Sequence, residues 1–261
     1  GQAVLIVNYG AGTNSTAMLV EAVNRQIQVD AIVFADTGSE MPGTLAYVSQ
    51  FSTWLQSRGY PEVTVVKWIR RDGTFLPLHE WCERFVSLPS RAFGFSGCTS
   101  KWKQQPADKH IANLARVKAA HRRGKKVVRW LGYDADEPGR YERMRQGRAR
   151  DPLYEWRAPL VEWQYGRAEC VNTIASAGLC QPGKSACWLC PSTKRHEIDA
   201  LQRQHPSLLK RALAIEEKAD IDRKRIAGLG GSLNWAEYLK QPKMFAGLQP
   251  VDDACGCWDG E

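Results

Sequence analysis

Eight cysteines are the residues of this chain whose type and spacing most directly suggest chemistry. Cys187 and Cys190 form a C-x-x-C pair before a proline, a spacing that lets two thiolates reach one metal ion or one cluster. A redox dithiol is the main alternative for such a pair. Cys180 lies seven residues before Cys187 in a loop rich in Gly and Pro. Cys82 and Cys170 sit within helical or apolar stretches, so we expect both to be buried as small hydrophobic residues.

A second candidate site lies in the segment 10–16 (GAGTNST), between an apolar run and a helix-like stretch. Small residues at such a junction let backbone N–H groups approach an anion, and the helix dipole favours negative charge there. The segment is therefore a candidate phosphate site. A tight turn followed by a helix N-cap is the alternative, and the loop alone does not decide between the two.

The elements that would position these residues alternate between strands and helices. Apolar runs predict strands at 3–7, 31–35, 63–68 and 127–131. Helical spacing predicts helices from 14, at 45–55, 111–117, 169–177, 197–202 and 207–218. This alternation predicts an α/β fold, doubly wound, whose mostly parallel sheet is covered on both faces and binds ligands at the carboxyl ends of its strands.

Three segments show no clear periodicity of apolar residues. Residues 69–103 are rich in aromatic and turn residues and are interpreted as a functional insertion, and 132–152 as a charged loop. The segment from 228 onward also lacks periodicity. We therefore expect a nucleotide-binding α/β domain over 1–165, and a helical, cysteine-bearing segment over 166–261 that packs on the same domain.

Composition is typical of a globular protein, with 43% hydrophobic and 25% charged residues and no apolar run long enough for a membrane span. No secretory signal is visible, so we expect a cytoplasmic protein whose cysteines bind metal or act in redox chemistry rather than form disulfides. The formal charge is +8. Residues 116–150 alone carry twelve Lys and Arg against four acids, a charge that suits nucleic acid, a polyphosphate ligand or a solvated surface.

The first loop resembles the PP-loop of ATP pyrophosphatases and phosphoadenosine phosphosulfate (PAPS) reductases, whose pattern is Ser-Gly-Gly-x-Asp-Ser. Gly10, Ala11 and Gly12 stand for the first three residues, and Asn14 and Ser15 for the last two. The change from Asp to Asn at residue 14 removes a charge that some ATP-using members employ toward magnesium.

Three later segments are similar to motifs of the same superfamily, in the same order. These are Asp36-Thr-Gly38 after the second strand, Cys98 with Lys103 and Pro106, and the segment 132–140 (GYDADEPGR) after a later strand. For Asp36 the alternative is a turn residue that caps the next helix. The resemblance implies an adenine nucleotide alpha-hydrolase-like fold and the following nucleotide-binding residues: Tyr9, Gly10, Ala11, Gly12, Asn14, Ser15, Asp36, Thr37, Gly38, Glu137 and Arg140.

The resemblance also implies a metal centre, because the adenylylsulfate reductases bind a 4Fe-4S cluster with two adjacent cysteines and a C-x-x-C pair. Cys98, Cys187 and Cys190 match three of those four, while Thr99 replaces the fourth. Cys180 or a tail cysteine is the expected fourth ligand, unless one iron is left open. Zinc, or no metal, is the alternative. Only Cys-Gly of the reductases' C-terminal motif matches the tail, at Cys255, which is a candidate nucleophile; metal ligation by the tail, or no role, are the alternatives.

Two enzymatic functions follow from the resemblance. The first is an ATP-using enzyme that adenylylates a nucleobase or a small acceptor for sulfur transfer, with Lys103 and Arg140 acting on the nucleotide and magnesium as a candidate cofactor. The second is a sulfonucleotide reductase in which Cys255 attacks sulfur. A nucleotide-sensing module without activity is the third alternative. The expected partners are an adenine nucleotide, tRNA or DNA along 116–150, and a sulfur or electron donor protein.

Overall fold

The computed structural model describes residues 3–93, 97–219 and 226–241. Its five strands are β1 (Leu5–Asn8), β2 (Ala31–Asp36), β3 (Val63–Lys67), β4 (Val127–Trp130) and β5 (Tyr154–Arg157). They form one sheet in the order β3-β2-β1-β4-β5, and every neighbouring pair is parallel. The predicted α/β class with a parallel sheet is confirmed.

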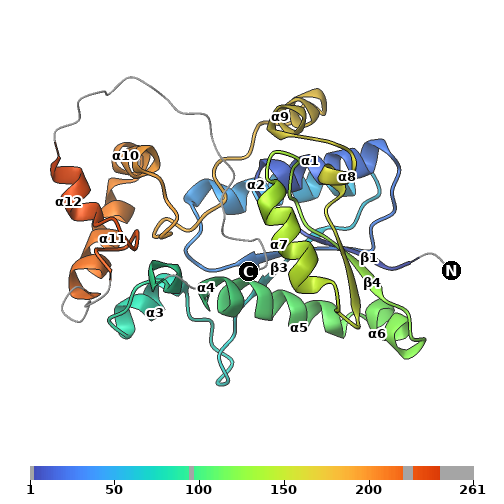
Figure 1. Cartoon of the computed structure of the whole chain (residues 1–261), viewed down its shortest axis with the longest axis horizontal. Coiled ribbons are helices and arrows are strands. Elements are labelled where there is room, and N and C mark those ends of the chain that lie inside the picture. Colours follow the sequence, from blue (N-terminus) through green and yellow to red (C-terminus); the bar gives the residue numbers. More distant parts are fainter. Residues whose placement is uncertain (1–2, 94–96, 220–225, 242–261) are drawn as a thin grey trace.

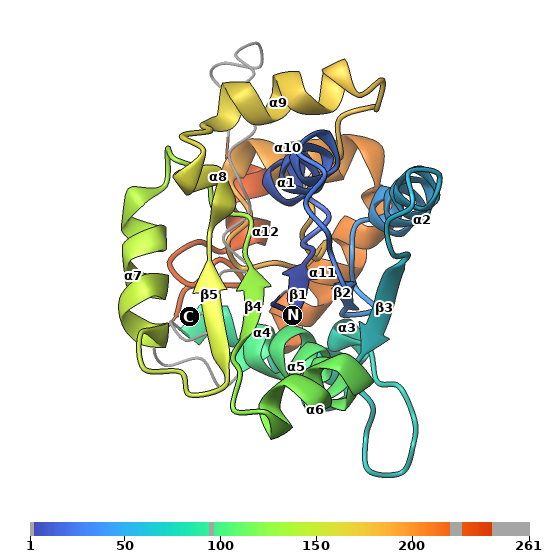
Figure 2. The same ribbon diagram turned by 90° about the vertical axis from the view of Figure 1, so that its right-hand side faces the viewer.

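Helices cover both faces of the sheet, as Figure 2 shows. One face packs against α1 (Thr13–Asn24), α2 (Pro42–Gln56), α8 (Pro159–Glu162) and α9 (Arg167–Ser176). The other face packs against α5 (Gln105–Asn113) and α6 (Ala115–Arg122). The strands alternate accordingly, because Leu5 and Val7 face the first layer while Ile6 faces the second. The doubly wound arrangement is therefore confirmed.

A second apolar cluster lies beside the sheet and joins segments that are distant in sequence (Figure 1). It combines α3 (Leu78–Arg84), the short helical turns 90–93, 97–99 and 100–104, and the C-x-x-C loop. The remaining contributors are α10 (Arg195–Gln204), α11 (Pro206–Ala219) and α12 (Trp235–Lys240). The C-terminal helical extension that carries cysteines is confirmed. No helix in the described ranges combines the length and apolarity needed to cross a membrane.

Four element predictions were wrong or incomplete. The charged loop 132–152 contains α7 (Pro138–Arg148), which buries only Met144 and so lacks an apolar periodicity. The part of the segment after 228 that the structure describes, residues 228–241, contains the short helix α12, capped by Asn234. The helix expected over 111–117 is two helices, because Leu114 has an extended backbone. Edge strand β5 was missed, since its four residues alternate between half-buried and exposed positions without a fully buried one.

Candidate functional site

Successive loops meet at the carboxyl edge of the sheet, where the topology places the ends of β1, β2 and β4. The turn after β4 touches the start of α1, since a Cβ on Gly132 would lie 2.9 Å from the backbone nitrogen of Ser15. The loop after β2 approaches from the other side. The predicted phosphate segment therefore lies at the centre of this edge.

The loop 9–16 has the features of an anion site. Ala11 adopts a left-handed backbone with φ 58°, and Gly12 gives an extended entry into α1 without a side-chain cap. No acidic residue lies in the first turn of α1, so its free N–H groups and dipole favour an anion. The Ser15 hydroxyl closes the loop by accepting from the N–H of Gly10 at 3.2 Å and donating to the carbonyl of Gly12 at 3.3 Å.

Tyr9, at the start of this loop, packs into the core between the sheet and α2. Its side chain is fully buried, its hydroxyl lies 3.1 Å from Thr16 Oγ1, and its ring packs on Phe51 at 5.4 Å. Burial raises the pKa of the Tyr9 hydroxyl well above its ordinary value, so it stays protonated.

The segment Asp36-Thr-Gly38 forms a tight turn at the end of β2. Asp36 accepts a hydrogen bond from the N–H of Gly38 at 2.7 Å and pairs with Lys67 at 3.2 Å. Gly38 has φ 72°, and a Cβ there would lie 2.7 Å from the ring of Phe75. Asp36 is a turn residue, as the alternative expected, but it does not cap the next helix, because Met41 stands at the N-cap of α2. Nucleotide binding by Asp36 stays a prediction, and its carboxylate has Gly38 and Lys67 as partners.

The C-x-x-C loop docks on both preceding loops. The N–H of Trp188 donates to the carbonyl of Ser39 at 3.0 Å, and Met41 donates to Ala186 at 3.0 Å. Ser185 contacts the loop 9–16, the candidate phosphate loop. A Cβ on Gly12 would stand 2.8 Å from the hydroxyl oxygen of Ser185. The structure thus brings the cysteine loop to the predicted phosphate site.

A buried polar network surrounds Cys187. Thr37 donates to Glu40 at 2.9 Å and lies 3.1 Å from the Cys187 sulfur, while Lys103 Nζ is 3.8 Å from the Glu40 carboxylate. All four side chains are buried. Burial, followed by the nearby Glu40 carboxylate, raises the pKa of Cys187 well above its ordinary value, while the Lys103 ammonium opposes this shift. The thiol form of Cys187 is therefore favoured in the absence of a metal.

The expected cysteine ligands separate into two groups. Cys187 and Cys190 are buried in the second apolar cluster and Cys98 packs against it, together with Cys82. Cys180 is exposed near the start of the same connection between α9 and α10, where its carbonyl accepts from the Tyr47 hydroxyl at 2.9 Å. Among the described residues, no three His, Cys, Asp or Glu side chains stand close enough to hold a metal. Burial of Cys82 and Cys170 is confirmed, and it raises the pKa of each to about 12. Cys255 lies outside the described residues.

The segment 132–140 contributes an acid pair and a guanidinium to the same edge. Arg140 pairs with Glu137, and its guanidinium carbon lies 5.2 Å from the centroid of the Tyr133 ring. Asp134 is buried and accepts from the side-chain amide of Asn14 at 2.7 Å. Burial, then the neighbouring Glu137 carboxylate, raises the pKa of Asp134.

Asp134, Ser185 and Glu40 are site residues that sequence reasoning missed. The first two lie within or beside a predicted motif, and Glu40 ends the segment that begins at Asp36. Their position next to a motif was the available signal. Their contacts join residues far apart in the chain, so spacing alone could not assign them.

The basic stretch 116–150 is divided in space. Exposed basic residues of α6 and the turn after it precede β4, so they lie toward the amino edge of the sheet, away from the phosphate loop. Helix α7 begins at the carboxyl edge with Arg140 and runs back along β5. There Arg148 packs on Trp156 at 3.7 Å and is half-buried.

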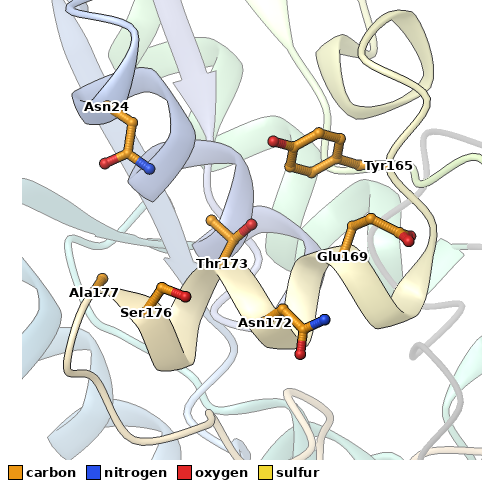
Figure 3. Close-up of a pocket in the computed structure, with 7 residues that line it drawn as sticks. All are labelled: Asn24, Tyr165, Glu169, Asn172, Thr173, Ser176 and Ala177. Carbon is orange, nitrogen blue, oxygen red and sulfur yellow. The ribbon is translucent and has the colours of Figure 1, made fainter.

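Two surface cavities lie away from the phosphate loop. The first, of about 450 Å³, lies between the end of α1 and α9, and Figure 3 shows its largely polar lining, which includes Asn24, Tyr165 and Glu169. The second, of about 760 Å³, is lined by residues that precede β2 and β3, including Asp30 and Pro61. Neither lining includes the loop 9–16.

No family model and no curated protein matches the chain. Among solved structures, it is similar to a PAPS reductase from Candida auris in a phosphate complex, with 14% identity, a TM-score of 0.44 and coverage of 68% of this chain and 74% of that one. It is also similar to the U34-tRNA thiolase NcsA from Methanococcus maripaludis with its 4Fe-4S cluster, with 14% identity, a TM-score of 0.44 and coverage of 91% and 80%. Both similarities are remote.

Proposed function

We propose that this protein is an adenine-nucleotide-binding enzyme of the PP-loop and PAPS reductase superfamily. In the proposed reaction, an acceptor oxygen attacks the α-phosphorus of ATP, the bond between the α- and β-phosphates breaks, and pyrophosphate leaves. A sulfide-level sulfur from a donor protein then attacks the activated acceptor carbon, the bond from that carbon to the AMP oxygen breaks, and AMP leaves without any change of oxidation state. The acceptor is a nucleobase or a small molecule.

The observation that carries this proposal is the docking of the C-x-x-C loop on the phosphate loop. Ser185 lies against Gly12, and Cys187 joins Thr37 and Glu40 of the neighbouring turn. A phosphate site alone would suit many nucleotide-binding proteins. Buried thiols fixed beside it suit sulfur chemistry on the bound nucleotide.

The phosphate group is proposed to bind at the first turn of α1. The N–H groups of residues 12–15 supply donors, and Arg140 supplies a guanidinium at the rim of the same edge. Lys103 is assigned the role of balancing the negative charge of the Glu40 carboxylate beside Cys187. Magnesium is a candidate partner of the triphosphate.

An iron–sulfur centre is proposed at Cys98, Cys187 and Cys190. Cys187 and Cys190 belong to one apolar cluster, Cys98 packs against it, and thiols are the soft donors that iron–sulfur clusters and zinc prefer. No three of the described His, Cys, Asp or Glu side chains stand close enough to hold a metal, so this proposal requires the three thiols to move together when the iron–sulfur cluster binds. A cluster bound there would supply an iron site for sulfur transfer. The exposed position of Cys180 makes it a weaker candidate for the fourth ligand than a tail cysteine.

The test uses anaerobically purified full-length protein. Iron and acid-labile sulfide are measured, and Cys187→Ser is compared with Cys170→Ser, which alters a cysteine in the core between the sheet and α9. We expect Cys187→Ser to lose most of the bound iron and Cys170→Ser to keep it. Equal iron in both variants would refute the proposed ligand.

Activity is tested in two parallel assays. ATP with magnesium and a tRNA, DNA or small-molecule acceptor should yield pyrophosphate. PAPS with a thiol reductant should yield sulfite only if the protein is a reductase, and that activity should then disappear in Cys255→Ser. Absence of both products would favour a nucleotide-sensing module, and absence of ATP binding would overturn the proposal.

A further inference from the structure

Three polar side chains from distant segments meet beside the phosphate loop. Asn14 lies in the first turn of α1, Asp134 follows β4, and Arg167 begins α9. The Asn14 amide donates to Asp134 at 2.7 Å, and its oxygen accepts from Arg167 at 3.3 Å. Asn14 and Asp134 are 6% and 2% exposed, so little water competes for these bonds.

This arrangement requires an amide at residue 14. One end of the Asn14 side chain faces a carboxylate and the other faces a guanidinium, so it must donate at one end and accept at the other. A carboxylate at residue 14 would face that of Asp134 across 2.7 Å, and two buried carboxylates at that distance strongly disfavour joint ionisation. The identities of residues 14 and 134 are therefore coupled.

The segment that carries Asp134 is itself fixed to α9. Asp134 accepts from the N–H of Asp136 at 3.1 Å, and Asp136 accepts from the N–H of Arg167 at 2.7 Å. The N–H of Ala135 donates to the carbonyl of Tyr165 at 2.7 Å. The Asn14 side chain thus ties the start of α1 to a rigid support rather than to a free loop.

Asn14 also contributes to the surface that would meet the phosphate. It is the second residue of α1, and its backbone N–H is one of the donors that have no partner within the helix. A displacement of its side chain therefore displaces the amides of the proposed phosphate site.

We propose that Asn14, Asp134 and Arg167 form one positioning unit that holds the first turn of α1 in the geometry that binds phosphate. The inference rests on the proposed nucleotide binding and deepens it, because it assigns Asp134 as a positioning residue that orients the Asn14 amide without touching the nucleotide. In this chain the carboxylate of the pair stands at residue 134 and the amide at residue 14.

The test exchanges the two side chains. Asn14→Asp should weaken ATP binding about tenfold or more, because the new carboxylate faces Asp134. Asp134→Asn keeps one acceptor oxygen for the Asn14 amide, although it loses the bond from the Asp136 N–H, and it should change the dissociation constant less than about threefold. The double exchange N14D/D134N restores opposite donor and acceptor roles, and it should recover most of the affinity lost in N14D.

Asn24→Asp is the matched control, because Asn24 lies on the same helix and donates to the Glu21 carboxylate at 3.0 Å. It adds the same charge opposite a carboxylate at the far end of α1, and it should leave ATP binding unchanged. The second measurement is the affinity for adenosine, which lacks phosphate. A positioning role predicts that N14D weakens ATP binding while adenosine binding stays constant.

Calorimetric titration of folded variants gives distinct outcomes. Wild-type protein that does not bind ATP would overturn the proposed function and this inference together. Wild-type binding that N14D leaves unchanged, or a loss in N14D that the double exchange does not recover, would overturn the positioning unit alone. Equal losses for ATP and adenosine would assign Asn14 a merely structural role and also overturn it.

Discussion

At the scale of single residues, Gly132 controls how closely β4 approaches the phosphate loop. A Cβ at this position would stand 2.9 Å from both the Cα and the backbone nitrogen of Ser15. Backbone atoms cannot rotate away as a side chain can, so Gly132→Ala should destabilise the fold by about 1–3 kcal/mol and weaken ATP binding. Urea denaturation and calorimetric titration measure the two effects.

The control for Gly132 is Gly147, which lies within α7 and where an added Cβ would meet no heavy atom within 4 Å. Gly147→Ala should be neutral or stabilising by up to about 1 kcal/mol, since Ala favours a helix over Gly. Equal stabilities for the two variants would refute the close contact at Ser15.

The burial of Asp134 predicts a pH dependence of stability. Because burial raises its pKa, the folded state holds the proton more tightly than the unfolded state, whose ordinary value is 3.8. This contribution is complete below about pH 3.8 and is lost as the pH rises through the higher folded-state pKa. The side chain of Asp134→Asn does not ionise, so the variant does not lose this stability as the pH rises.

The free energy of unfolding of wild type and Asp134→Asn is measured between about pH 3.5 and 7. This interval begins just below the ordinary Asp pKa of 3.8 and extends about three units above it. Relative to wild type, the variant should gain stability as the pH rises. A difference that stays constant, or that changes in the opposite direction, would contradict a raised pKa.

The sequence could indicate the phosphate loop and the C-x-x-C pair because each is a local pattern of residue types. It could not indicate that Asp134 serves Asn14, or that Glu40 lies beside Cys187, since these contacts join residues 120 and 147 positions apart. Asp36 shows the converse. Its place after β2 predicts ligand binding, and the structure shows in addition that its carboxylate accepts from the Gly38 N–H and so stabilises the turn.

At the scale of elements, apolar runs predicted β1, β2 and β4 because these central strands are buried along most of their length. Edge strand β3 was predicted from its three valines, although after Val63 its residues alternate between half-buried and exposed positions. The same logic failed for α7 and α12. Helix α7 is stabilised by a proline in its first turn and by charge pairs such as Glu142 with Arg145, and not by an apolar face. Hydrophobic periodicity cannot detect such a helix.

Helix α12 depends on one buried carboxylate from α11. Glu216 accepts from the N–H groups of Leu229 at 2.6 Å, Trp235 at 3.0 Å and Ala236 at 3.0 Å. Glu216→Ala would leave these buried donors without that acceptor, at about 1–3 kcal/mol for each unsatisfied group. We therefore expect α12 to detach before the sheet unfolds.

Hydrogen exchange measures this detachment. Amides of α12 should exchange much faster in Glu216→Ala, while those of β1 keep the protection of the wild type. Glu217→Ala is the control, because Glu217 is the exposed neighbour on the same helix. Unchanged exchange in α12, or equal acceleration in both variants, would contradict the capping role of Glu216.

At the scale of the whole molecule, the two segments expected from the sequence, 1–165 and 166–261, share their apolar cores. Helix α9, from the second segment, places Cys170 and Ile174 in the core formed by the sheet and α1. Residues Leu78 and Trp102, from the first segment, belong to the cluster of the C-terminal helices. The sequence suggests a boundary near 165, but packing between the two segments is not visible in the sequence.

This shared packing predicts that residues 1–165 do not fold alone. Removal of α9 exposes the apolar face of α1, and removal of the C-terminal helices exposes α3. The fragment should lack a cooperative thermal transition and should bind a hydrophobic dye, whereas the full chain should unfold in one calorimetric step. Addition of the separate fragment 166–261 should restore the transition, because each fragment supplies the missing part of the other's core. A fragment 1–165 that unfolds cooperatively at the temperature of the full chain would instead make the first segment an independent domain.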